Sequence, residues 1–369
     1  MDNYHSKLKQ RYTAKLRVLE GQLPYYCTQY FNAKSHVLEK QSAFAYAVDF
    51  KVFFEFLKLH FPEYEEMAIK DIPLSAFESI SSHDMNAYIA FLEDYELDGD
   101  HRHNGENGIQ RKLSSVKSLC RYLFKEEMIA KNPAELVEMP KQHKKDILIL
   151  KDSEISRLFY VIENEIGMTQ FQAEYNKKCI NRDYAIMMMF LGTGMRISEL
   201  VGLDLRDIDF TENLAHIIRK GGNEQYVFFS QQVADALRQY LGLGIYTGSK
   251  GTRAAFGVEE DEQALFVSIQ KRRLSVRAVQ KLVAKYSNLA FDSVNSDRKN
   301  INQKNKLHAH LFRKTYGTNL YLDTKDIKLV QDTLGHNSIT TTEKHYVKDS
   351  KEHRKLAARD VLQNPNIKG

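Results

Sequence analysis

Residues 191–200 read LGTGMRISEL, a turn with two glycines that leads into a helix. Glycine supplies the backbone freedom that such a turn needs. The turn places Arg196 at the start of the helix, where a guanidinium group and free backbone amides together suit a phosphate. The segment lacks the spacing and the Gly-Lys-Ser/Thr ending of a nucleotide-binding P-loop, so the sequence argues against an NTPase. By itself, an arginine at such a place is usually a surface residue.

Polar residues in a fixed order follow Arg196 further along the chain. They are Lys220 in RKGGN, His310 and Arg313 in HLFR, His336 in LGH, and Tyr346 in TEKHYV. His310 and Arg313 are three residues apart, about one helical turn, so their side chains are expected on one helix face. Lys220 is expected at the tip of a β-hairpin, because LAHIIRKGGNEQYVFFS alternates in polarity around its Gly-Gly pair.

This constellation resembles the active site of the tyrosine recombinases, the λ-integrase and Xer superfamily. The phrases TGMRISEL, RKGGN, HLFR and LGHNSITTTEKHY resemble the family's motif boxes and stand in its order. The likeness covers about residues 40–349, because the helices expected over 45–135 resemble the family's SAM-like core-binding domain. LPYYCTQYF at 23–31 and KDIPLSAFESIS at 70–81 carry a narrower likeness to the Xer-type single recombinases of low-GC Gram-positive bacteria. A mobile-element integrase is the other interpretation of the same motifs.

Two details depart from the family's usual pattern. Phe312 and Lys314 stand where the family usually has leucine and histidine. The step from His336 to Tyr346 is one residue longer than in the Xer pattern, as it often is in integrases of mobile elements. His345 occupies the shorter spacing, so Tyr346 is the nucleophile candidate of this motif.

The resemblance implies DNA strand transfer without a metal or any other cofactor. A phosphodiester repels nucleophiles, and its transition state carries extra negative charge that fixed donors must meet. Arg196 and Arg313 can each donate two hydrogen bonds to the non-bridging oxygens. His310 and His336 can bond the same phosphate or accept the proton of the attacking phenol.

The nucleophile and the general acid complete this scheme. A phenol with a pKa of about 10 is mostly protonated at neutral pH, so Tyr346 needs a base before it attacks. Lys220 on its hairpin is suited to protonate the departing 5′ oxygen. The implied product is a 3′-phosphotyrosyl enzyme, which conserves bond energy until a foreign 5′ hydroxyl rejoins the strand.

The resemblance also implies the partners. They are duplex DNA with a specific recombination site and further copies of the chain, which form a homo-tetramer with a dimer on each site. Strand exchange then passes through a Holliday junction, for chromosome-dimer resolution or for integration and excision of a mobile element. An accessory or directionality protein is left open.

Three other functions are alternatives to recombination. A type IB topoisomerase shares the chemistry but needs no synapsis, and the core-binding-like helices argue against it. A catalytically inactive DNA-binding accessory protein should have lost some of the motif residues, and all of them are present. A metal-dependent DDE-type transposase predicts that EDTA abolishes cleavage.

The expected fold is mainly α with a small β-hairpin or sheet (α+β), in two domains. Helices are expected over 43–60, 82–97, 108–127, 182–191, 230–241 and 275–289 and through most of the region after 310, with loops at 242–263 and 291–306. A helical core-binding domain over 1–140 and a catalytic domain over 148–369 are joined by a linker at 138–147. The catalytic domain is expected to end in a tail helix at about 350–363.

One helix of the first domain is the expected DNA contact. In the segment 108–127 the apolar residues recur at helical spacing, and Lys112, Lys117, Arg121 and Lys125 remain for other faces. Basic and acidic side chains are almost equal in number over residues 1–145, so net charge gives no support. A solvated helix face is the alternative interpretation.

Composition is that of a globular protein of more than one domain. The chain has 369 residues with 53 Lys and Arg against 48 Asp and Glu, a formal charge of +5. No apolar run approaches the length of a membrane span, and the charged N-terminus lacks the apolar core of a secretion signal. Three scattered cysteines, Cys27, Cys120 and Cys179, indicate buried thiols in a reducing compartment. A cytoplasmic protein, on the nucleoid when bound to DNA, is expected.

Several other polar residues receive structural roles. Asp204, Asp207 and Asp209 are expected to cap and shape the turn before the hairpin rather than to bind a metal. Glu199 is expected to orient Arg196 or its helix. His308 is expected on the surface, with no catalytic role.

Overall fold

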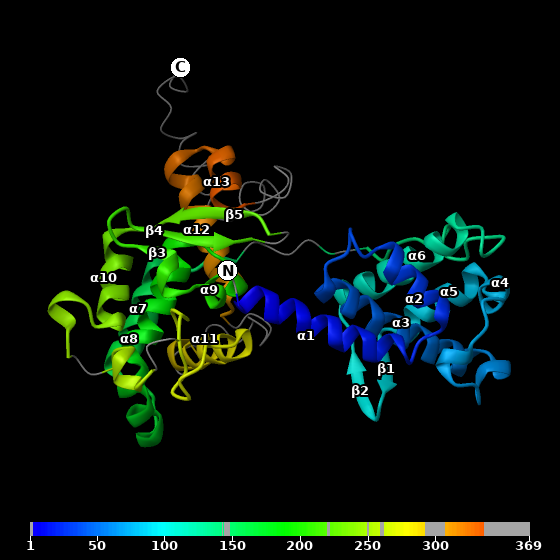
Figure 1. Ribbon diagram of the computed structural model, residues 1–369, viewed down its shortest axis with the longest axis horizontal. Coiled ribbons are helices and arrows are strands. Elements are labelled where there is room, and N and C mark those ends of the chain that lie inside the picture. Colours follow the sequence, from blue (N-terminus) through cyan, green and yellow to red (C-terminus); the bar gives the residue numbers. More distant parts are fainter. Residues whose placement is uncertain are drawn as a thin grey trace, which may run out of the picture. The chain divides into compact units, whose positions relative to one another are not determined.

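The computed structural model describes residues 3–141, 143, 148–219, 222–248, 251–258, 262–291 and 307–335. The chain divides into two compact units, residues 1–144 and 145–369, and each is described by itself (Figure 1). The linker predicted over 138–147 lies across this division. Lys220, His336, Tyr346 and the tail helix predicted over 350–363 lie outside the described residues.

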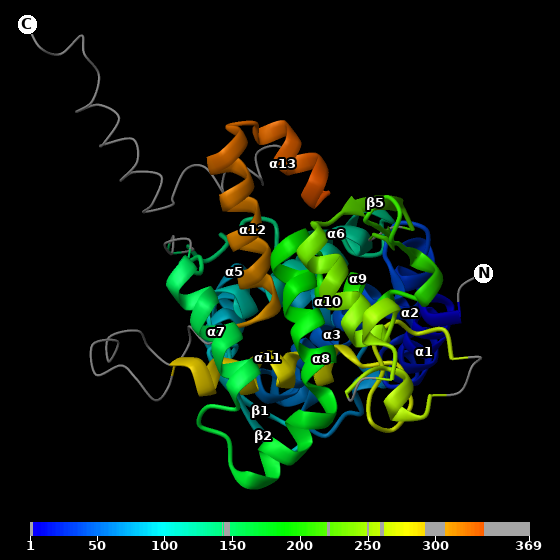
Figure 2. The ribbon, with the colours of Figure 1, turned by 90° about the vertical axis from the view of Figure 1, so that its left-hand side faces the viewer.

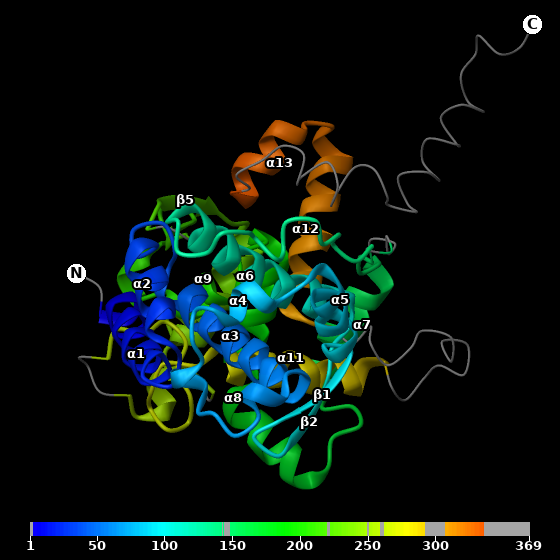
Figure 3. The same ribbon diagram turned by 90° about the vertical axis from the view of Figure 1, so that its right-hand side faces the viewer.

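The first unit is a cluster of helices with one antiparallel hairpin (Figure 3). Its elements are α1 (Asn3–Glu20), α2 (Tyr25–Ala33), α3 (Lys40–His60), η1 (Pro62–Tyr64), η2 (Ile69–Asp71), α4 (Ala76–Ser79), α5 (Ser82–Phe91), β1 (Asp94–Leu97), β2 (Asp100–His103) and α6 (Glu106–Lys125). Helix α3 contacts α1, α5 and α6. Its aromatic side chains form the centre of the core, where Phe50, Phe53 and Phe54 are fully buried. Burying several aromatic side chains of this size is the main stabilising contribution.

The helix predicted over 82–97 is shorter than expected. A capping box starts α5, because the Asp84 amide donates to Ser81 Oγ (3.3 Å) and the Ser81 amide donates to the Asp84 carboxylate (2.8 Å). The prediction is wrong over 94–97, which form strand β1. Asp98 and Gly99 have φ of 53° and 77°, so they form a two-residue turn with positive φ at both positions that pairs β1 with β2.

The second unit combines helices with a small sheet (Figure 2). Its elements are α7 (Asp152–Asn164), α8 (Gln170–Thr193), α9 (Ile197–Gly202), η3 (Leu205–Asp207), β3 (Ile208–Asp209), β4 (Leu214–Ile218), β5 (Glu224–Phe228), α10 (Gln231–Leu241), η4 (Gly244–Tyr246), η5 (Ala254–Phe256), α11 (Val276–Phe291), α12 (Ala309–Thr324) and α13 (Ile327–Leu334). The strands form an antiparallel sheet in the order β3-β4-β5. The predicted hairpin is confirmed, with Ile218 paired to Glu224 at its closed end.

Helix α8 is the central element of the second unit. It contacts α7, α10 and α12, and Phe190 near its end is fully buried. The Phe190 ring stacks on the ring of Phe312 of α12, with centroids 5.8 Å apart and planes 2° from parallel. An aromatic residue at 312 therefore packs directly against α8, which explains why a phenylalanine fits where the family usually has leucine.

The predicted fold class is confirmed, as are the burial and the free state of the cysteines. Burial raises the pKa of the Cys120 thiol to about 12, which keeps it protonated and unreactive. The loop predicted over 242–263 contains the short 3₁₀ turns η4 and η5. Within the described part of the chain, no helix combines the length and the apolar character needed to cross a membrane.

Candidate active site

The turn at 191–200 brings two helix ends together. Gly194 ends α8 in the left-handed conformation, with φ of 62°. Arg196 is the N-cap residue of α9, and its backbone amide donates to the carboxylate of Glu199 (2.7 Å). The Arg196 guanidinium donates to the same carboxylate, also at 2.7 Å. The predicted role of Glu199 is confirmed, because its carboxylate, 3% exposed, holds the guanidinium of Arg196, 37% exposed, at the surface.

Helix α12 carries the next two candidate residues, and they differ in exposure. His310 is exposed, while Arg313 is 2% exposed. The Arg313 guanidinium donates to the Gly194 carbonyl (2.8 Å) and to the Leu334 carbonyl. The buried arginine therefore joins α12 to the end of α8 and to the end of α13.

His308, predicted on the surface, is exposed and also caps α12. Its Nδ1 accepts the Leu311 amide at 3.2 Å, and its ring stacks on that of His310 at a centroid distance of 6.3 Å. Desolvation and the nearby ammonium of Lys314 lower the pKa of His308. Accepting this bond requires the neutral ring, which the lowered pKa favours.

The C-terminal end of α13 is the meeting point of three guanidinium groups. Arg196 donates to the Gly335 carbonyl at 3.4 Å, Arg313 donates to the Leu334 carbonyl, and Arg219 donates to the Thr333 carbonyl at 2.6 Å and to that of Leu334. The last carbonyls of a helix lack helical partners and carry partial negative charge, so they suit positive donors. His336 follows this cluster directly in the sequence.

Arg219 was not among the residues predicted from the sequence. It follows strand β4, is 8% exposed, and directly precedes Lys220. Burial lowers the pKa of Arg219 despite the nearby carboxylate of Glu199, and an arginine stays charged in such a setting. The signal in the sequence was the Arg-Lys pair at the hairpin tip, which does not reveal that its first member turns inward.

The candidate residues are thus brought together to the extent that the structure describes them. Arg196 and Arg313 both donate to carbonyls at the end of α13, Arg313 also donates to Gly194 at the end of α8, and His310 lies one helical turn before Arg313. Lys220, His336 and Tyr346 lie outside the described residues, although Arg219 and Gly335 adjoin the first two in the chain. The arrangement concentrates positive charge around one helix end, which suits a phosphate group.

The basic side chains of α6 do not form one face. The prediction for Lys112 is corrected, since this residue is 8% exposed and its ammonium donates to Asn104 Oδ1 (3.1 Å) rather than facing solvent. Lys117 is partly exposed and donates to the Val137 carbonyl. Arg121 and Lys125 are exposed. Positions 117, 121 and 125 are four apart and share a helix face, whereas 112 points elsewhere because five residues do not complete whole turns.

The aspartates before the hairpin shape the turn as predicted. The Asp204 amide donates to the Asp207 carboxylate (2.7 Å), and the Thr211 amide donates to Asp209 Oδ1 (2.7 Å). The Asp204 carboxylate also pairs with Arg273. No cluster of three or more metal-ligating side chains occurs among the residues that the structure describes.

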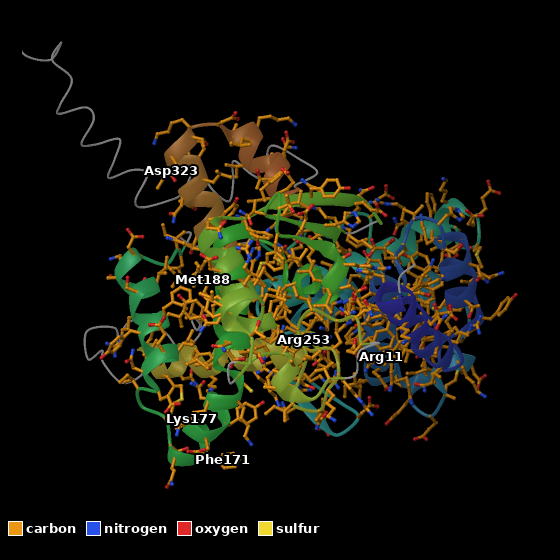
Figure 4. The ribbon with its side chains drawn as sticks, turned by 60° about the vertical axis from the view of Figure 1, so that its left-hand side comes forward. Arg11, Phe171, Lys177, Met188, Arg253 and Asp323 are labelled. Atoms are coloured by element: carbon orange, nitrogen blue, oxygen red, sulfur yellow. The ribbon has the colours of Figure 1, made fainter. Side chains whose placement is uncertain are left out.

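A cavity of about 880 Å³ lies among α7, α8, α10 and α12. Its lining includes apolar side chains such as Phe159 and Met188 and the carboxylates of Glu163, Asp235 and Asp323. Figure 4 labels Met188 on α8 and Asp323 on α12. The cavity therefore combines an apolar lining with negative charge.

The sequence of the chain is similar to those of known proteins. Residues 150–353 match the phage integrase family, a range that includes all six motif residues. The tyrosine recombinase XerC of Caldanaerobacter subterraneus subsp. tengcongensis is 30% identical over 326 residues, covering 86% of this chain and 81% of that protein. The tyrosine recombinase XerS of Streptococcus sanguinis is 29% identical over 363 residues, covering 91% of this chain and 95% of that protein.

The fold has counterparts among solved structures. The XerH site-specific recombinase bound to palindromic difH substrate, in a post-cleavage complex, matches with a TM-score of 0.62. The match covers 92% of this chain and 83% of that structure at 18% identity. At this identity the likeness concerns the fold.

Proposed function

The chain belongs to the phage integrase family, and on that premise we propose that it is a site-specific DNA recombinase with Tyr346 as its nucleophile. The observation that carries the proposal is the convergence of Arg196 and Arg313 on the backbone that directly precedes His336. Two arginines held by the same helix end support the proposal that both bind one phosphate group.

The proposed reaction transfers the 3′ phosphate of the DNA to Tyr346 and then to a new 5′ hydroxyl. Tyr346 Oη attacks the phosphorus and loses its proton to a histidine, with His310 and His336 as the candidates. The bond from phosphorus to the 5′ oxygen breaks, and Lys220 gives that oxygen a proton. The 3′-phosphotyrosyl link is later broken by a 5′ hydroxyl of the partner strand, which restores the phenol.

We propose that this chemistry is independent of metal. Arg196 and Arg313 supply the positive charge that a metal ion supplies in other phosphoryl-transfer enzymes. Lys117, Arg121 and Lys125 on α6 are proposed to contact DNA phosphates. Lys112 is buried and is not proposed to contact DNA. We propose that the protein acts in the cytoplasm, on the nucleoid that contains its DNA substrate.

The active assembly is proposed to be a tetramer on two synapsed sites. The tail at 350–363 carries the apolar residues Leu356, Ala357, Val361 and Leu362 among charged ones, of which four are Lys or Arg and two are Asp or Glu. A short apolar stripe of this kind needs a partner surface. The cavity among α7, α8, α10 and α12 offers apolar side chains with carboxylates, and we propose that it receives the tail of a neighbouring protomer.

The test is covalent capture of DNA in excess EDTA. The probe is a nicked duplex with the sequence that the wild-type protein enriches from a random pool. We expect an SDS-resistant adduct with the wild-type protein and none with Tyr346→Phe, which should bind the duplex with unchanged affinity. An adduct in Tyr346→Phe would assign the attack to another residue, and loss of the wild-type adduct in EDTA would overturn metal independence.

A further inference from the structure

We propose that Arg219 is a positioning residue that fixes the base of the β4–β5 hairpin, so that Lys220 meets the departing 5′ oxygen. This inference rests on the proposed function, which assigns that proton to Lys220. The phosphate contacts stay with Arg196 and Arg313, and Arg219 is assigned only the anchoring of the hairpin through its two bonds to backbone carbonyls.

The anchor is the C-terminal end of α13. One terminal nitrogen of Arg219 donates to the Thr333 carbonyl at 2.6 Å and the other to the Leu334 carbonyl. Arg219 is 8% exposed, so water competes little for these bonds. A fork of two charge-assisted bonds fixes the direction of the guanidinium as well as its position.

Gly335 leaves room for the guanidinium of Arg219 where it lies. Its φ of 62° is left-handed, and a Cβ built there would collide with Nη1 of Arg219. Any side chain at 335 would therefore displace the guanidinium. The arginine and the glycine fit as a pair although they are 116 positions apart in the sequence.

The backbone of Arg219, the residue directly before Lys220 in the sequence, closes the β4–β5 hairpin. Its amide donates to the Asn223 carbonyl (2.8 Å), and its carbonyl accepts the Gly222 amide (3.0 Å). From β5, Gln225 Nε2 donates to the Asp332 carbonyl (2.8 Å). Both sides of the hairpin are thus hydrogen-bonded to α13. On the β4 side the bonds come from Arg219, which is buried and directly precedes Lys220 in the sequence.

Loss of the fork should loosen the hairpin and weaken proton transfer more than any other step. General acid catalysis contributes about 100-fold or more, and a displacement of about 1 Å of a catalytic group can cost about 100-fold. A leaving group that needs no proton should remove this dependence. A bridging 5′ sulfur provides one, because it departs as a thiolate when the bond from phosphorus to sulfur breaks.

The experiment compares oxygen and sulfur at the bridging 5′ position of the scissile phosphate in the same nicked, pool-selected duplex. Single-turnover adduct formation is measured for wild type, Arg219→Ala, Arg219→Lys and Lys220→Ala. Tyr286→Phe is the control, because it removes a buried hydroxyl that bonds Asp183 and Asn176 elsewhere in the unit. Thermal unfolding shows which variants are folded, and Arg219→Lys keeps the charge if Arg219→Ala fails to fold.

We expect both Arg219 variants and Lys220→Ala to cleave the oxygen duplex about tenfold to 100-fold more slowly than wild type. All three should approach the wild-type rate on the sulfur duplex, and Tyr286→Phe should match wild type on both. An Arg219 defect that persists on sulfur while Lys220→Ala is rescued would overturn the positioning role alone, as would wild-type rates on oxygen. An unrescued Lys220→Ala would overturn the proton assignment to Lys220 and the positioning role with it.

Discussion

The guanidinium of Arg313 donates a hydrogen bond of 2.8 Å to the carbonyl oxygen of Gly194. Gly194 is two residues before Arg196, so this bond links the two arginines proposed to bind phosphate. The link depends on glycine, because φ at 194 is 62° and a Cβ there would lie 2.5 Å from Cδ1 of Tyr316. The backbone at Gly194, two residues before Arg196, therefore packs closely against α12.

Gly194→Ala is expected to lower the free energy of unfolding of the protein by about 3 kcal/mol. Left-handed backbone costs an alanine about 1 kcal/mol or more, and crowding against Tyr316 adds about 1–3 kcal/mol. Gly244→Ala is the matched control, because φ there is 60° but no heavy atom lies within 4 Å of the built Cβ. Urea unfolding should show the larger loss for position 194. Equal losses would mean that close packing at Gly194 contributes nothing.

Acidification is expected to destabilise the protein through His308. Its pKa in the folded protein lies below the ordinary 6.5, so the unfolded chain binds the proton more readily. The stabilisation from neutral His308 is therefore present above about pH 6.5 and is lost as the pH falls through the lower folded value. His308→Asn keeps a capping oxygen that does not titrate. Between about pH 7.5 and about pH 5.5 the wild type should lose more stability than the variant, and parallel losses would contradict the role of His308.

The salt dependence of DNA binding tests the face of α6. Replacing Lys117, Arg121 and Lys125 by alanine should reduce the slope of log affinity against log salt by about one for each lost phosphate contact. Lys112→Met should leave the slope unchanged, because Lys112 is buried. Fluorescence anisotropy over a salt series measures both. A triple variant with the wild-type slope would show that these side chains are solvated and do not contact DNA phosphates.

Deletion of residues 353–369 tests assembly through the tail. The truncated protein should bind a single site normally but show reduced cooperativity and slower recombination of two sites. Asp323→Lys, which adds positive charge to the lining of the cavity, should weaken recombination of the full chain in the same way. Gel-shift titration and two-site recombination assays report these steps. Recombination by the truncated protein at the wild-type rate would show that the tail does not dock on a neighbour.

Much of the fold could be predicted from local patterns, and the errors have local causes. The hairpin around 220 was predicted because polarity alternates on both sides of a Gly-Gly pair, and the register confirms it. The strand at 94–97 was missed because its apolar residues also fit a helix, although Asp98-Gly99 was a turn signal. The family resemblance, carried by motif order, is confirmed by the family match.

The site was predictable in its residue types but less so in its contacts. The pairing of Arg196 with Glu199 follows from a three-residue spacing at a helix start and was predicted. The inward turn of Arg219 depends on Gly335, far away in the sequence, and no local pattern reveals such a contact. The burial of Lys112 depends on its angle around the helix, since it lies five residues before Lys117 and therefore away from the face shared by Lys117, Arg121 and Lys125.

The central claim is that Tyr346 forms a 3′-phosphotyrosyl bond, and identifying the DNA-linked residue tests it most directly. The adduct trapped on the nicked duplex is digested with protease and nuclease, and tandem mass spectrometry locates the attached nucleotide. We expect a 3′-linked nucleotide on Tyr346. A nucleotide on any other residue, or one linked through its 5′ phosphate, would contradict the account.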